Sequence, residues 1–103
     1  MTEGKEEGLE IIIVCYNTPV ELIMCISSVM LFTKNSKVIV VNNSDIEMPI
    51  EEISKEGIIK KVIEEGNLGF CKGVNRGVEE VETERFAILP ADCMLTKGWE
   101  NRM

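Results

Sequence analysis

Two short, almost continuous apolar runs constrain the fold of this chain more than any other feature. They are residues 9–14 (LEIIIV) and residues 38–41 (VIVV), and neither alternates regularly between apolar and polar side chains. Runs of this kind are typical of strands that are buried on both faces, as in parallel sheets. Because parallel strands need a long crossover, usually a helix, we expect helices between the runs.

The segment after the first run predicts a helix start. Thr18 is the expected N-cap, Pro19 the first helical residue, and Glu21 the partner that completes a capping box. Apolar residues follow at helical spacing and are expected to cover the sheet: Leu22, Ile23, Ile26, Val29 and Met30.

Two more helices and two more strands complete the pattern. Residues 50–56 form a short candidate helix that Gly57 stops, and residues 66–69 (GNLG) lead into a third helix. Its apolar stripe consists of Phe70, Val74, Val78 and Val81. Residues 58–63 predict a third strand, placed at a sheet edge by its two lysines, and residues 85–89 predict a fourth.

Strand–helix alternation with short connections predicts an α/β fold, with Rossmann-like βαβ units around a mainly parallel sheet. A chain of 103 residues supports one modest core. We therefore expect a single domain over residues 9–103, preceded by a disordered acidic tail at residues 1–8.

Charge and cysteine content argue against several classes of protein. The net charge of -7 is unsuited to coating nucleic-acid phosphates. The longest apolar stretch, residues 20–32, contains Glu21 and is too short for a transmembrane segment, so a core helix is expected. Four cysteines without C-x-x-C spacing, in a chain that lacks histidine, favour reduced thiols in the cytoplasm over a zinc site.

Polar loop residues follow each predicted strand. They lie at residues 15–17, 42–44 and 66–69 and at Asp92, and the carboxyl ends of parallel strands are where such folds bind ligands. These residue types also favour plain turns, and both interpretations stay open. Neither G-x-G-x-x-G nor G-x-x-x-x-G-K-[ST] occurs, and without histidine no Ser/His or Cys/His pair can form.

Four segments, in this order and spacing, resemble glycosyltransferase family 2. They are residues 11–17 (IIIVCYN), 38–44 (VIVVNNS), 67–77 (NLGFCKGVNRG) and 89–92 (LPAD). The third segment is the most specific, and the resemblance extends from Leu9 to Trp99. It implies a GT-A fold, incomplete here, in which this chain is the N-terminal half that binds a nucleoside diphosphate sugar, often a uridine one.

The resemblance also implies which residues contact the nucleotide. The backbone around Cys15, Tyr16 and Asn17 would line the base pocket, and Asn42 stands where the family usually has a base-binding aspartate. An amide can both donate and accept, so Asn42 remains a candidate. The full candidate set is Cys15, Tyr16, Asn17, Asn42, Asn43, Asn67, Gly69, Lys72, Asn75 and Arg76.

The third predicted helix carries glycines and cations. Gly69, Gly73 and Gly77 lie four residues apart on one face, which permits close approach either of the sheet or of a ligand. Lys72 and Arg76 are the nearest cations for a diphosphate, although solvated helix charges would have the same pattern.

Asp92 aligns with the last aspartate of the family's D-x-D motif. The resemblance therefore implies a divalent metal, Mg²⁺ or Mn²⁺, held by this carboxylate. Pro90 occupies the first acidic position and offers no side-chain ligand. A turn or N-cap role for Asp92 is the alternative.

The resemblance thus implies a glycosyltransferase domain that binds a nucleoside diphosphate sugar, a UDP sugar by analogy with the family, for metal-assisted transfer to an unidentified acceptor. The alternative is a non-catalytic nucleotide-binding or interaction module on the same scaffold. Catalytic residues are unassigned. We expect this chain to be inactive alone, because members of the family take their catalytic general base from a later segment. An open edge at residues 85–89 further predicts a homodimer.

Overall fold

The computed structural model describes residues 6–33, 35–46, 48–55 and 57–91, in which strands and helices alternate. The strands are β1 (Glu6–Cys15), β2 (Ser36–Asn42), β3 (Ile59–Ile63) and β4 (Thr83–Pro90). The helices are α1 (Pro19–Phe32), α2 (Ile50–Ser54) and α3 (Phe70–Val78). Each element expected from the sequence is present in the expected order.

The four strands form one sheet with the order β3-β2-β1-β4, and all neighbours are parallel. β1 is central, so that Ile11 lies opposite Val38 of β2 on one side and Ala87 of β4 on the other. β3 forms one edge, as its lysines predicted, and β4 forms the other edge of the described sheet. The predicted α/β class with a parallel sheet is confirmed.

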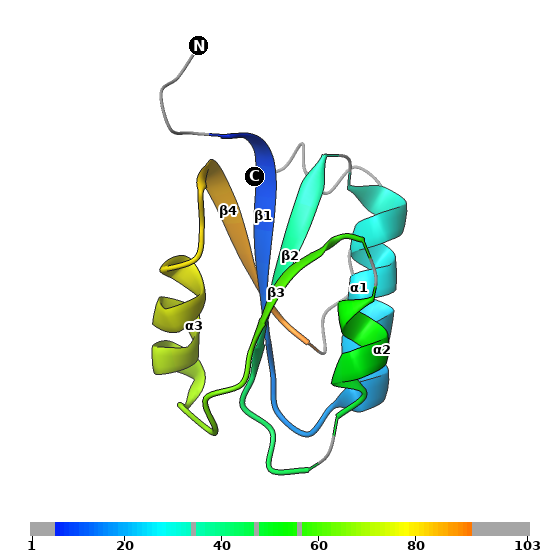
Figure 1. The fold of residues 1–103 in the computed structure, drawn as a ribbon, viewed down its shortest axis with the longest axis vertical. Coiled ribbons are helices and arrows are strands. Elements are labelled where there is room, and N and C mark those ends of the chain that lie inside the picture. The colour runs from blue at the N-terminus through cyan, green and yellow to red at the C-terminus, as the bar shows by residue number, and fades with distance from the viewer. Residues whose placement is uncertain (1–5, 34, 47, 56, 92–103) are drawn as a thin grey trace.

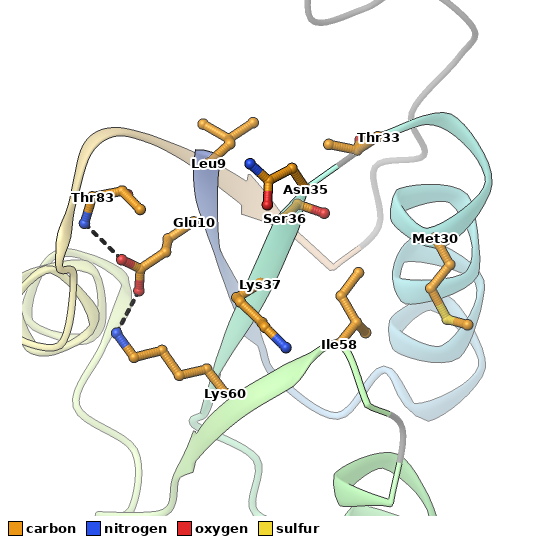
Figure 2. A pocket seen from close by; sticks show the side chains of 10 residues that line it. All are labelled: Leu9, Glu10, Met30, Thr33, Asn35, Ser36, Lys37, Ile58, Lys60 and Thr83. Carbon is orange, nitrogen blue, oxygen red and sulfur yellow. Dashed lines mark hydrogen bonds and ion pairs between the residues drawn. The ribbon is translucent and has the colours of Figure 1, made fainter. Parts of the chain in front are cut away.

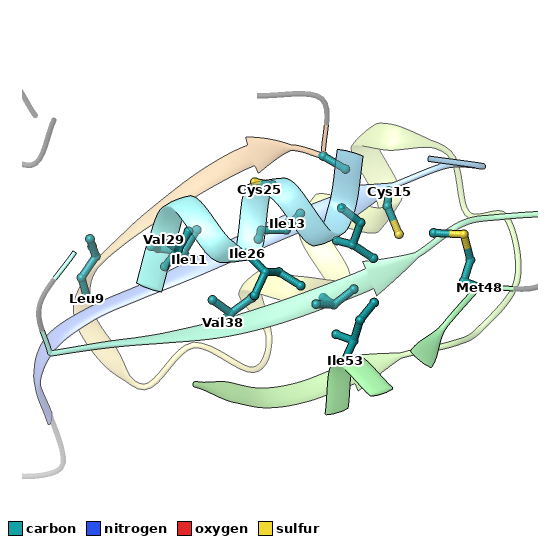
Figure 3. Close-up of a cluster of buried hydrophobic side chains, with 13 residues drawn as sticks. Leu9, Ile11, Ile13, Cys15, Cys25, Ile26, Val29, Val38, Met48 and Ile53 are labelled. Atoms are coloured by element: carbon teal, nitrogen blue, oxygen red, sulfur yellow. The ribbon is translucent and has the colours of Figure 1, made fainter. Parts of the chain in front are cut away.

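Helices cover both faces of this sheet. Figure 1 shows α1 and α2 on one face and α3 on the other. On the first face, side chains of α1 pack over those of β1 and β2, as Figure 3 shows for Val29, Ile11 and Val38, all of which are fully buried. Truncating one such side chain to alanine typically costs about 2–5 kcal/mol, so this layer fixes how α1 sits on the sheet.

The buried stripe of α1 is narrower than the sequence predicts. Leu22 and Ile26 are buried, but Ile23 and Met30 are 46% and 49% exposed. The prediction that these two residues cover the sheet is therefore wrong. The sequence of α1 is apolar on nearly all sides, so its periodicity did not distinguish the inward face.

Glycines bring α3 close to the other face. A Cβ at Gly77 would lie 2.6 Å from Ile12 Cγ2, and one at Gly73 would lie 3.0 Å from the side-chain Nδ2 of Asn43. Both positions are buried against the sheet. Of the two alternatives for these glycines, the structure supports tight helix–sheet packing rather than an open face for a ligand.

The first strand begins earlier than predicted. β1 starts at Glu6, so residues 6–8, assigned above to the tail, belong to the strand. Gly8 has a φ of +109°, and the β1–β4 register shifts between Glu6 and Leu9. Only glycine adopts this φ without strain, which permits an irregular strand where the apolar pattern has not yet begun.

The start of α1 is confirmed in position but not in its cap. Pro19 is the first helical residue after Thr18. No side chain caps the helix, and the buried Thr18 Oγ1 has no hydrogen-bond partner among the described residues. The capping box with Glu21 is therefore wrong. Thr18 has a ψ of 65° rather than the extended conformation that directs an N-cap hydroxyl at the helix amides.

A buried carboxylate connects three strands at the amino end of the sheet. Glu10 is 3% exposed and accepts hydrogen bonds from Lys60 Nζ (2.7 Å) and from the backbone N–H of Thr83 (Figure 2). It also accepts a hydrogen bond from the backbone N–H of Glu82. Burial raises the pKa of Glu10, but these hydrogen bonds outweigh it, and the net pKa is lowered. Glu10 can occupy a buried position within the first apolar run because these partners satisfy its carboxylate.

Candidate functional site

A hollow of about 380 Å³ lies at the carboxyl ends of β1 and β4, beside the start of α3. Ligand sites in open parallel sheets occupy this position, and the volume is within the range of small-molecule pockets. The described residues that line it are Val14, Cys15, Tyr16, Thr18, Asn43, Asn67, Gly69, Phe70, Pro90 and Ala91. Five of the ten predicted nucleotide-binding residues are therefore brought together here.

The loop after β1 is connected to the loop after β2 by hydrogen bonds. Tyr16 Oη donates to Asp45 Oδ2 at 2.7 Å, and the Asn17 N–H donates to Ser44 Oγ at 2.8 Å. The hydrogen bond to Asp45 and its negative charge both raise the pKa of Tyr16. Asn17 has a φ of +55° and accepts the Asp45 N–H on its Oδ1. Asn17 therefore contributes to the site by shaping the loop rather than by lining the hollow.

Asn42 lies beside this network but does not line the hollow. Its Oδ1 accepts the Ser44 N–H at 3.0 Å and lies 3.6 Å from the Cys15 thiol, which donates to it. The backbone donor identifies this atom as the oxygen, so the remaining polar group of the side chain is Nδ2. If Asn42 contacts a base, it does so as a donor.

Asn43 supports the start of α3. It is 3% exposed, its Oδ1 accepts the Leu68 N–H, and its Nδ2 donates to the Gly69 carbonyl. Both ends of the amide are thus engaged within the chain. Asn43 lines the hollow through its position, while its hydrogen bonds hold the loop that precedes the helix.

The first turn of α3 faces the hollow without a side-chain cap. Gly69 is the N-cap, with a φ of +79°, and its own N–H is held by Asn67 Oδ1 at 3.0 Å. An uncapped helix start leaves backbone N–H groups and a partial positive charge available to an anion. Gly69 is required here for its backbone conformation, unlike the two packing glycines farther along.

Phe70 is a residue of the site whose position the sequence pattern predicted wrongly. We predicted it in the buried stripe of the third helix, but it is 53% exposed and lines the hollow. Val74, Val78 and Val81 do pack against the sheet, as predicted. The sequence did carry a signal that Phe70 is exposed. It directly follows the N-cap Gly69, and so lies at the open start of the helix rather than over the sheet.

Comparison with known proteins identifies the family of the chain. The chain matches the profile described as glycosyl transferase family 2 over residues 10–103. The chain belongs to this family. Among curated proteins, none matches the chain by sequence.

Solved structures support the same fold for this family 2 chain. The structure of S. aureus TarS residues 1–349 aligns with a TM-score of 0.78 at 17% identity, over 93% of this chain and 31% of that chain. A second structure of S. aureus TarS aligns with a TM-score of 0.78 at 18% identity, over 93% of this chain and 18% of that one. The GT-A type fold is thereby confirmed. The chain spans less than a third of the length of either structure.

The predicted cations of the family 2 motif differ in their availability. Arg76 is 23% exposed and forms ion pairs with Glu65 (2.9 Å), Glu80 (2.8 Å) and Glu79 (3.5 Å). Hydrogen bonds to Glu80 and Glu65 raise its pKa. Lys72 lies exposed in the first turn of α3, and within the described ranges no ion pair engages it. Lys72 is thus the better candidate for an anion at the helix start.

Asn75 and Arg76 stand apart from the hollow. Asn75 is exposed on α3, and neither residue is among those that line the hollow. Within residues 75–77 (NRG), Gly77 has a structural role, because it allows α3 to pack closely on the sheet. Contact of Asn75 with a nucleotide stays a prediction.

The family's metal site falls largely beyond the described ranges. Asp92, the predicted ligand, lies outside the described residues, and its described neighbours Pro90 and Ala91 offer no side-chain oxygen. Within residues 6–91, apart from the gaps given above, no three acidic or cysteine side chains come together to hold a metal. The Mg²⁺ or Mn²⁺ expectation stays a prediction.

Cysteines in and near the site are thiols. Cys15 is 1% exposed, and burial raises its pKa, so its neutral form is favoured. Cys25 is a buried residue of α1, and Cys71 is exposed on α3. No described helix is long and apolar enough to cross a membrane.

A larger hollow, of about 730 Å³, lies at the opposite, amino end of the strands (Figure 2). Its charged groups are already paired: Lys60 with Glu10, and Lys37 Nζ with the Gly57 carbonyl at 3.1 Å. A ligand there would have to break these contacts. The smaller hollow, with its uncapped helix start, is the better candidate site.

Proposed function

We propose that this family 2 chain binds a nucleoside diphosphate sugar in the hollow at the carboxyl end of the sheet, as the donor for sugar transfer to an acceptor. The observation that carries this proposal is the uncapped start of α3, which opens into a hollow walled by Tyr16 and Phe70. Aromatic walls suit a base or sugar ring, and helix N–H groups suit a diphosphate.

The diphosphate is proposed to lie over the first turn of α3. Gly69 brings the backbone to the surface without a side chain, and Lys72 adds a positive charge within the same turn. Local positive charge is needed because the net charge of the chain is -7. Helix-terminus interactions of this kind contribute about 0.3–1 kcal/mol each when exposed.

Uracil is the first nucleotide base to test, since family 2 members often use UDP sugars. The engaged oxygen of Asn42 leaves an amide donor near the β1 loop, and uracil carbonyl oxygens can accept from it. A carboxylate in this place would instead accept from the ring N–H. We therefore propose UDP sugars with a relaxed requirement for the uracil ring N–H.

Sugar transfer needs a proton acceptor that the described lining of the hollow does not supply. Family 2 chemistry calls for a base that takes the proton of the acceptor hydroxyl. None of the described residues that line the hollow is a carboxylate or a histidine. We propose that the 103-residue chain binds the donor but does not transfer the sugar alone. No step is assigned to a metal, because its candidate ligand, Asp92, lies outside the described residues.

A non-catalytic module on this scaffold remains the second candidate. Asn42 replaces the aspartate with which the family usually binds the nucleotide base, and Pro90 replaces the first acidic residue of its metal motif. Both replacements favour this alternative. Both candidates bind the nucleotide, and neither predicts turnover by this chain alone; they differ in whether the bound donor is used for sugar transfer. A cytoplasmic location, consistent with the thiols, is also proposed.

Calorimetric titration of the chain with UDP, UDP-glucose, UMP and inorganic diphosphate tests the proposal. We expect UDP and UDP-glucose to bind more tightly than UMP, because the diphosphate reaches the start of α3. Lys72→Ala is the matched variant and should reduce this preference. Equal binding of UMP and UDP would contradict the assigned diphosphate position. Transfer of glucose from UDP-glucose to an added acceptor would reject the proposal that the chain alone is inactive.

We also propose that β4 mediates self-association. It is the last strand on its side of the described sheet, with Phe86 and Ile88 38% and 39% exposed. In an antiparallel β4–β4 pair centred on Ala87, Phe86 of each copy would lie opposite Ile88 of the other. Aromatic pairs with β-branched residues contribute about 0.2–1 kcal/mol each, and open strand edges readily pair.

A further inference from the structure

Tyr16 presents a half-exposed aromatic ring at the proposed nucleotide site. Tyr16 is 50% exposed and forms a wall of the hollow at the carboxyl end of the sheet. An exposed tyrosine side chain normally samples several rotamers. A ring that is to stack on a ligand must lose this freedom on binding, unless the protein has already restricted it.

Asp45 supplies the restriction from the neighbouring loop. Its Oδ2 accepts the phenolic O–H at 2.7 Å, which is a charge-assisted hydrogen bond of short length. Asp45 is not among the described residues that line the hollow, and its negative charge would repel a diphosphate. Its contact with Tyr16 is therefore better explained by orientation of the ring than by ligand binding.

The loop that carries Asp45 is itself tied to the backbone next to Tyr16. Asn17 Oδ1 accepts the N–H groups of Asp45 (2.8 Å) and Ile46 (3.3 Å), and the Asn17 N–H donates to Ser44 Oγ (2.8 Å). Asn17 adopts a φ of +55°, in the left-handed region that asparagine tolerates better than most residues. The Tyr16 side chain is thus held at its backbone and at its hydroxyl by the same loop.

We propose that Asp45 is a positioning residue of this site, which fixes the Tyr16 ring as a preorganised stacking surface for the nucleotide base. The inference rests on the proposed nucleotide-binding function. Its physical basis is the rotamer entropy of Tyr16, which the Asp45 contact restricts before the ligand arrives. Loss of one such restriction should weaken base-dependent binding by about three- to tenfold.

The test compares UDP with inorganic diphosphate on the same variants. Asp45→Ala should weaken UDP binding by about three- to tenfold without weakening diphosphate binding, because diphosphate has no base to stack and meets one repelling charge fewer. Asp45→Asn keeps an acceptor and should restore most of the UDP affinity. Glu84→Ala, an exposed acidic residue on β4, is the matched control for loss of one negative charge.

Tyr16 is also the only tyrosine in the chain, so its phenolate absorbance reports on this contact alone. Asp45 raises the pKa of Tyr16 through its hydrogen bond and its charge. Asp45→Ala should therefore lower the pKa of the phenol, whereas Glu84→Ala should not. Tyr16→Phe should match Asp45→Ala in UDP binding, and the double variant should be no worse than either single variant.

The possible outcomes separate the two levels of the account. Absence of UDP binding by the wild-type chain would overturn the proposed function and this inference with it. Normal UDP binding by Asp45→Ala, or additive losses in the double variant, would overturn the positioning role alone. Equal losses for UDP and diphosphate would also overturn it, because they would indicate general damage to the site.

Discussion

Substitution of Gly77 by alanine tests the close packing of α3 against the sheet. A Cβ at this position would lie 2.6 Å from Ile12 Cγ2 and 3.3 Å from Val41 Cγ2. Both neighbours are buried in the sheet, at 0% and 1% exposure, so neither has space to move aside. Ordinary contact begins at 3.4 Å, and α3 must therefore move away from β1 by about 0.8 Å.

Two opposing contributions determine the magnitude of the effect. Alanine is more favourable than glycine inside a helix by about 1 kcal/mol. Overpacking of a well-filled core costs about 1–3 kcal/mol, and here the clash is with side chains rooted in a central strand. We expect the clash to outweigh propensity by about 1 kcal/mol, which lowers the Tm by about 4–8 °C for a domain of this size.

Thermal unfolding followed by circular dichroism measures this change. Gly57→Ala is the matched control, because a Cβ there meets nothing within 4 Å. It should leave the Tm unchanged or raise it slightly. A Gly77→Ala variant more stable than the wild type would show that helix propensity dominates, and it would refute the close packing of α3.

Three further predictions concern charge, the loop before α3 and the sheet edge. Because the folded-state pKa of Glu10 is lowered, its carboxylate stabilises the fold above the unfolded-state pKa of about 4.3, and this contribution is lost as the pH falls through the folded-state value. Glu10→Gln should therefore make stability, measured by urea unfolding, less dependent on pH across that acidic range; an unchanged dependence would contradict the role of Glu10. Asn43→Ala leaves the Leu68 N–H and the Gly69 carbonyl without their partner, so urea unfolding should show a loss of about 1–3 kcal/mol together with weaker UDP binding. Ile88→Lys should abolish concentration-dependent association in light scattering, and a wild-type chain that is monomeric at all concentrations would reject the β4 interface.

The order of elements and the parallel sheet were predictable from the sequence, because buried strands and crossover helices leave strong apolar patterns. Residues 9–14 and 38–41 fall within the two central strands, and the two lysines of β3 correctly placed it at an edge. Boundaries were less predictable. The extension of β1 to Glu6 depends on pairing with the chain near Thr83, which local sequence does not reveal.

The candidate site was predictable in location but not in the function of each residue. Asn43 and Arg76 appear in the sequence as polar residues of a binding motif, yet their polar groups bind the chain itself. Leu68 and Gly69, the partners of Asn43, and Glu65, one partner of Arg76, lie 11–26 residues away in the sequence, so only the folded arrangement reveals these contacts. Glu80 lies four residues after Arg76, and helical spacing alone could have indicated that pair. Phe70 shows the converse case, since an apolar residue assigned to the core lies open at the hollow.

Binding of a nucleoside diphosphate at the carboxyl end of the sheet can be followed residue by residue with protein-observed NMR during titration with UDP. We predict that backbone amide signals of residues 15–17, 43 and 67–72 shift together and saturate with one dissociation constant. Shifts confined to the hollow at the amino end, around Leu9, Lys37 and Ile58, would contradict the account, as would the absence of any shift at saturating UDP.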